Sequence, residues 1–86
     1  MEDKIRELLE ASINQEGYQL DEVKYGKDEN NINTLTIVID KEGYINIADC
    51  VKVNDIVNPL LDKADLIAES YVLDVCSKEK GNDQNG

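Results

Sequence analysis

Hydrophobic and polar positions alternate most regularly in the middle of the chain, where residues 34 to 40 read Thr-Leu-Thr-Ile-Val-Ile-Asp. Leu35, Ile37 and Ile39 share one side of this largely β-branched run, a pattern that favours a strand with one buried face. The strand is expected to end near Asp40, because Lys-Glu-Gly follows at residues 41 to 43 and glycine takes positive φ without steric cost. This strand is the predicted centre of the fold.

Apolar residues recur at helical spacing in two other segments. Residues 3 to 16 carry a narrow apolar stripe and end at Gly17, which suits the position just past a helix. The polar side of this segment is not basic, which favours packing on the core over binding to a membrane. A second helix is expected to start after Asn46, with Asp49 completing a capping box. Its broad apolar stripe comprises Cys50, Val53, Ile56, Val57, Leu60 and Leu61.

Pro59 interrupts the stripe of the second predicted helix. Proline removes a backbone donor and crowds the preceding turn, at a cost of about 3 kcal/mol in a regular helix. The helix is therefore expected to kink or restart at Pro59, with this residue opening a last short turn.

Two more strands are predicted, one over residues 20 to 25 and one in which Tyr71, Leu73 and Val75 alternate with Val72 and polar residues. The order α-β-β-α-β predicts a two-layer α+β domain over residues 1–77, with both helices on one face of a three-stranded sheet. Residues 78–86 are polar and lack an apolar anchor, so a disordered tail is expected there.

The chain is strongly acidic, with 19 Asp and Glu against 9 Lys and Arg and a net charge of −10. This charge repels nucleic-acid backbones and anionic membranes, and it suits a basic protein partner. Two cysteines without a signal peptide favour a reduced, cytoplasmic setting. The 86 residues correspond to one small domain.

No catalytic or metal-binding motif is present, so we expect no enzyme and no cofactor. Asp40 and Asp49 could act as an acid/base pair, but carboxylates near turns and helix starts are more often caps and solvated groups. Cys50 is interpreted as a small core residue, whereas Cys76 is expected on the face opposite the helices, where it could be oxidised. The acidic turns at residues 28–31 and 40–42 lack the EF-hand spacing for calcium.

Five short motifs follow one another along the chain: Gly17 to Leu20, Leu35 to Asp40, Asp49-Cys50, Leu61-Asp62 and Tyr71 to Ser77. Their order and spacing resemble the N-terminal domain of the ribosome maturation factor RimP family, over about residues 5 to 77. The Ser-Pro-Gly that ends the family pattern is missing, and the family's second, SH3-like domain has no counterpart in this sequence.

This resemblance implies the α-β-β-α-β fold of the RimP N-terminal domain, an architecture that also resembles bacterial-type KH domains. It further implies a non-enzymatic cytoplasmic factor that assists maturation of the small ribosomal subunit by binding a basic ribosomal protein or pre-subunit surface. Direct RNA binding is not expected, because the Gly-x-x-Gly loop of KH domains is absent and each lysine has acidic neighbours. The alternative is a free-standing interaction domain, homodimeric or not, that is no longer tied to the ribosome.

The partner-binding surface is predicted on the sheet face opposite the helices. Strand alternation directs one set of side chains to that face, where no second helical layer is expected to cover them. The apolar members would form an exposed patch rimmed by acids, although single apolar residues on exposed strands can also be simply good strand formers. With Asp40 and the alternative site at Asp49, the candidate residues are Leu20, Glu22, Thr36, Val38, Asp40, Asp49, Val72, Asp74 and Cys76.

Overall fold

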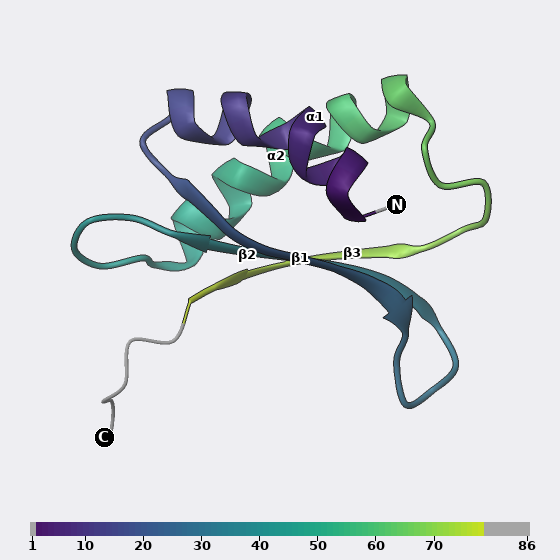
Figure 1. Ribbon diagram of the computed structural model, residues 1–86. Helices are drawn as coiled ribbons and strands as arrows, with labels where there is room; N and C mark the ends of the chain where they lie inside the picture. Colours follow the sequence, from purple (N-terminus) through teal and green to yellow (C-terminus); the bar gives the residue numbers. More distant parts are fainter. Residues whose placement is uncertain (1, 79–86) are drawn as a thin grey trace.

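Two helices lie together on one face of a twisted sheet, and no helix formed by residues 2–78 lies on the other face (Figure 1). The computed structural model describes residues 2–78. Of the tail predicted to be disordered over residues 78–86, Lys78 is described and bonded to the sheet, and residues 79–86 lie outside the described range. The elements in chain order are α1 (Glu2–Gln15), β1 (Gln19–Lys27), β2 (Asn33–Asp40), α2 (Ile47–Ala64) and β3 (Val72–Ser77). The predicted α+β class and the α-β-β-α-β order are confirmed.

The strand centred on Ile37 is the middle strand of the sheet, because the strand order is β1-β2-β3. β1 runs antiparallel to β2, with Val23 opposite Ile37, and β3 runs parallel to β2, with Val75 opposite Ile37. Pairing continues one residue beyond β3, since the Lys78 N–H donates to the Ile39 carbonyl at 2.8 Å. β1 and β3 are therefore the two edge strands.

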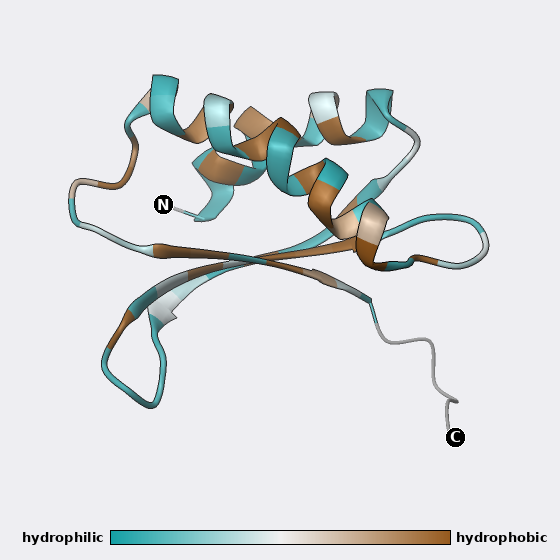
Figure 2. Cartoon of the chain, turned by 180° about the vertical axis from the view of Figure 1, so that it is seen from behind, coloured by the Kyte–Doolittle hydropathy of each residue, from teal (hydrophilic) through white to brown (hydrophobic). Residues whose placement is uncertain are grey.

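The core lies between the sheet and the helices, and the hydrophobic segments of the helices and strands face one another there (Figure 2). The strand side chains predicted to alternate inward on β2 are all fully buried. Three residues of α1 and three of α2 close the core from above, at the spacing of one helix face. The buried residues are Ile5, Leu9, Ile13, Tyr18, Leu20, Val23, Leu35, Ile37, Ile39, Val53, Val57, Leu61 and Ile67.

The helix ends follow the capping residues that the sequence contains. Gly17 follows α1 with φ of 93°, and its N–H donates to the Asn14 carbonyl at 3.0 Å, which satisfies one of the last free carbonyls. Asn46 caps α2 and forms the predicted capping box with Asp49. The α2 end was not predicted, because the left-handed residue there is Asp65, a non-glycine whose N–H donates to the Leu61 carbonyl.

The predicted break at Pro59 is wrong, because α2 continues through it from Ile47 to Ala64. Proline removes only one helical hydrogen bond here, and Pro59 itself lies on the exposed side of the helix. Val57 and Leu61, on either side of it, are anchored in the core. Tertiary packing of the flanking turns therefore outweighs the local cost of the proline.

Replacing Pro59 with Ala is expected to stabilise the domain, because alanine restores the missing backbone donor in a helix that is already continuous. The free energy of unfolding should rise by about 1 to 3 kcal/mol, the difference in helix propensity between the two residues. Denaturant unfolding followed by circular dichroism measures this change. Asn58→Ala, an exposed substitution at the neighbouring position of the same helix, is the control; a destabilised Pro59→Ala variant would contradict the account.

Candidate functional site

The open face of the sheet is the first candidate surface, and strand register fixes which side chains it contains. Across the three strands, Glu22, Val38 and Cys76 form one row, and Lys24, Thr36 and Asp74 form the next. Thr34 and Val72 make a third row, and Asp40 lies opposite Gln19 at the end of the sheet. We call this set the open face. It brings together seven of the nine predicted partner-binding residues.

Leu20 does not belong to the open face, which corrects the prediction. Its side chain is 6% exposed, and it pairs with Ile39 on the core side. The cause is a register shift in β1 between Leu20 and Glu22, where an extra residue in the strand reverses the alternation. Strict alternation would have placed Asp21 in the core, and this conflict was the available signal for a bulge.

The apolar part of the open face is divided rather than continuous. Val38 and Cys76 are opposite each other and half-buried, whereas Val72 is 52% exposed and lies four residues before Cys76 on β3. Thr36 and Asp74 separate them. The face is thus a mixed surface on which acids alternate with small apolar groups.

Cys76 is a weakly acidic thiol rather than a reactive one. Partial burial raises its pKa, and Asp74 raises it further through its charge and by accepting a hydrogen bond from the Cys76 Sγ at 3.7 Å. The thiolate needed for oxidation chemistry is therefore disfavoured at neutral pH. Cys50 is also a free thiol, at an intermediate depth on α2.

The start of α2 is the second candidate surface, and Asp49 is its centre. One Asp49 carboxylate oxygen accepts from the Tyr18 hydroxyl at 2.6 Å, and the other accepts from the Asn46 N–H at 3.0 Å. Lys41 Nζ lies 3.2 Å from the carboxylate and 5.7 Å from the centre of the Tyr18 ring. The cluster ties α2 to the loop after β2 and to the residue that precedes β1.

These contacts hold Asp49 ionised and Tyr18 neutral. The hydrogen bond from Tyr18, aided by the Asn46 N–H and Lys41, lowers the pKa of Asp49 to about 2. The same hydrogen bond, with burial and the negative charge of Asp49, raises the pKa of Tyr18 to about 12. Both carboxylate oxygens of Asp49 accept hydrogen bonds within the domain, which agrees with a capping role. A role of Asp49 in partner binding stays a prediction.

A set of exposed apolar residues near this cluster was missed by the sequence reasoning. Tyr44 is 87% exposed, Ile47 is 83% exposed and Val51 is 54% exposed. Ile47 and Val51 are one helical turn apart and lie on one flank of α2, beside its buried stripe. The offset of this pair from the core positions was a signal in the sequence.

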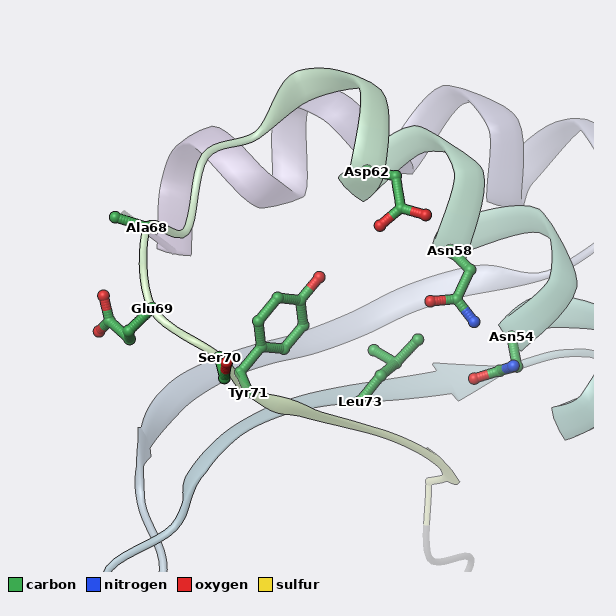
Figure 3. Close-up of a pocket in the computed structure, with 8 residues that line it drawn as sticks. All are labelled: Asn54, Asn58, Asp62, Ala68, Glu69, Ser70, Tyr71 and Leu73. Atoms are coloured by element: carbon green, nitrogen blue, oxygen red, sulfur yellow. The ribbon is translucent and has the colours of Figure 1, made fainter.

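A shallow pocket of about 550 Å³ lies beside this helix, between α2 and β3 (Figure 3). Two acids line it and no basic residue does. Tyr71 projects from the loop toward Asp62, and burial together with the Asp62 charge raises the Tyr71 pKa. The lining residues are Asn54, Asn58, Asp62, Ala68, Glu69, Ser70, Tyr71 and Leu73.

Within residues 2–78, no group of three or more His, Cys, Asp or Glu side chains is arranged to hold a metal ion. None of the described helices combines the length and the apolar character needed to cross a membrane. Asp40 and Asp49, the pair considered for acid/base chemistry, serve local structure: Asp40 accepts from the Lys41 N–H and Asp49 completes the cap. That the domain is not an enzyme stays a prediction.

Fold and surfaces together define a small two-layer α+β domain in which one sheet face is not covered by any helix of the described residues. Residues 8–78 match the family model of the RimP N-terminal domain. The chain belongs to this family, which is a family of ribosome maturation factors. The resemblance identified in the sequence is thereby confirmed.

Proposed function

We propose that this domain assists assembly of the small ribosomal subunit in the cytoplasm, without catalysis, by binding a basic ribosomal protein through the open face. The family supports a role in ribosome maturation in general. The observation that carries the choice of surface is the uncovered sheet: in the described part of the chain both helices pack on the opposite face, while Val72 remains half exposed.

The charge of the protein supports a basic protein as the partner rather than RNA alone. A net charge of −10 attracts a cationic surface at long range and repels a phosphate backbone. On the open face, Lys24 is paired with Glu22 at 3.6 Å, so Asp74 adds negative charge that this lysine does not offset. That the domain does not bind RNA directly stays a prediction.

The test is the double variant Val38→Thr with Val72→Thr, which keeps the β-branched shape and removes apolar surface from the open face. Loss of two methyl groups from a buried interface should weaken association with small ribosomal subunits about tenfold. Co-sedimentation of the purified domain with small subunits measures this change.

Ile32→Thr is the matched control, because it also replaces an exposed β-branched apolar residue with threonine, in the loop between β1 and β2. Thermal unfolding checks that all variants remain folded. Equal co-sedimentation of the double variant and the wild type would exclude the open face as the interface. Sedimentation of the domain alone tests the alternative of a homodimer, in which the double variant would lower self-association instead.

A further inference from the structure

The two edges of the sheet differ in how their backbone groups are satisfied. On the β1 edge, Glu2 accepts from the Tyr25 N–H at 2.8 Å, and Arg6 donates to the Leu20 and Asp21 carbonyls at 3.0 and 2.7 Å. Side chains of α1 therefore occupy this edge. Among residues 2–78, no side chain makes an equivalent hydrogen bond to the outer backbone of β3.

The outward-facing groups of β3 follow from its pairing. The Lys78 N–H donates inward to the Ile39 carbonyl, and alternate residues of a strand direct their backbone groups to the same side. The N–H and C=O groups of Leu73, Val75 and Ser77 therefore point away from β2. An unpaired edge of this kind is a template for an added strand.

Beside this edge lies one flank of α2, on which the type of side chain changes along the helix. Ile47, Val51, Asn54, Asn58 and Asp62 follow one another at spacings of four, three, four and four residues, so they share one flank of the helix. Asn54 and Asp62 line the pocket with Leu73 and Tyr71, which shows that this flank overlooks β3 in antiparallel order (Figure 3). The side chains on this flank of α2 thus change from exposed apolar (Ile47, Val51) to amide (Asn54, Asn58) to acidic (Asp62).

We propose that the β3 edge binds an extended, basic peptide segment of a partner protein as a fourth strand. The segment would place apolar side chains against Ile47 and Val51 and a lysine or arginine against Asp62 and Glu69. The span from Ile47 to Asp62 is about 22 Å along a helix, which six or seven residues of an extended chain cover. This inference concerns a surface separate from the open face and does not depend on it.

The charges of the pocket between α2 and β3 favour a basic peptide over a second copy of this chain. Its lining includes Asp62 and Glu69, and no lysine or arginine. Pairing two β3 edges would bring these acids and Asp74 of both copies together, and each copy carries a net charge of −10. A cationic peptide segment is instead attracted by these negative charges.

The probe is the nine-residue peptide Thr-Leu-Thr-Val-Thr-Thr-Thr-Lys-Thr, capped at both ends, together with the peptide of reversed order for the opposite strand direction. At least one should bind the full chain with a Kd below about 1 mM in a fluorescence titration. The matched control replaces its lysine with glutamate and should bind at least about fivefold more weakly. Amide exchange of Leu73, Val75 and Ser77, and not of their inward-facing neighbours, should slow on binding.

The decisive variant is Val75→Pro, which removes an outward N–H from an edge strand, where proline is tolerated. It should weaken peptide binding about tenfold or more, and Ser77→Pro, farther from the core, tests the same edge if the first variant does not fold. Val72→Thr, on the open face of the same strand, should have no effect. Asp62→Asn should reduce the preference for lysine over glutamate.

Several results would overturn the inference: no binding by either peptide order, equal binding by a folded proline variant, or protection of the inward-facing amides instead. A proline variant that changes only self-association would assign the edge to a second copy and would likewise overturn it. Because this assay contains no ribosomal subunits, its outcome is distinct from the co-sedimentation test of the open face.

Discussion

Replacing Ile37 with Ala is expected to remove about 2 to 5 kcal/mol from the free energy of unfolding. Ile37 is fully buried at the centre of the middle strand, opposite Val23 on one side and Val75 on the other. A domain of this size is stable by roughly 4 to 13 kcal/mol. The variant should therefore lose a large part of its stability, and partial unfolding at 37 °C is the expected consequence.

Urea unfolding followed by far-ultraviolet circular dichroism measures this loss. Ile37→Val is the graded control and should cost about 0.5 to 1.5 kcal/mol, because it removes one methylene from the same site. Thr36→Ala, the adjacent residue on the open face, should change the stability by less than about 1 kcal/mol. A cost for Ile37→Ala as small as that of Thr36→Ala would contradict the central place of β2 in the core.

The capping cluster at the start of α2 should give the domain a characteristic acid dependence. The pKa of Asp49 falls from 3.8 to about 2 on folding, so the ionised carboxylate stabilises the folded state above pH 3.8. This contribution should decline as the pH falls from about 4 toward 2. Asp49→Asn should therefore destabilise the domain at pH 7, and the difference from the wild type should disappear near pH 2.

The comparison between wild type and Asp49→Asn is needed because many other carboxylates titrate in the same range. Asn46→Ala, which removes the other half of the capping box, should cost about 0.5 to 2 kcal/mol with no comparable acid dependence. The Tyr18 hydroxyl has a pKa of about 12 against a usual 10.0, so its contribution is complete below pH 10 and is lost between pH 10 and 12. An Asp49→Asn difference that is constant from pH 7 to pH 2 would contradict this assignment.

The elements with the strongest periodicity were predictable from the sequence. The alternation around Ile37 and the helical stripe around Leu9 are signals of burial, and burial decided both structures. The capping box at Asn46 and Asp49 was also predictable, because it depends on two residues three positions apart. Local chemistry and tertiary packing agree at these positions.

Prediction failed where tertiary packing overrides a local rule. Pro59 locally favours a break, but the buried turns on either side keep α2 continuous. The bulge before Glu22 depends on pairing with β2, so alternation alone placed Leu20 on the wrong face. The hydrogen bond from Tyr18 to Asp49 joins residues 31 positions apart, and no local pattern specifies such a contact.

Closure of the β1 edge by Glu2 and Arg6 limits how far any strand addition could proceed. Continuous growth of a sheet from molecule to molecule requires each copy to offer two free edges, because heterologous contacts that do not close generate filaments. A copy that offers only β3 ends the series after a single addition. The hydrogen bonds from Glu2 and Arg6 to the β1 backbone thus stop sheet growth at that edge, and strand addition at β3 is confined to one-to-one complexes.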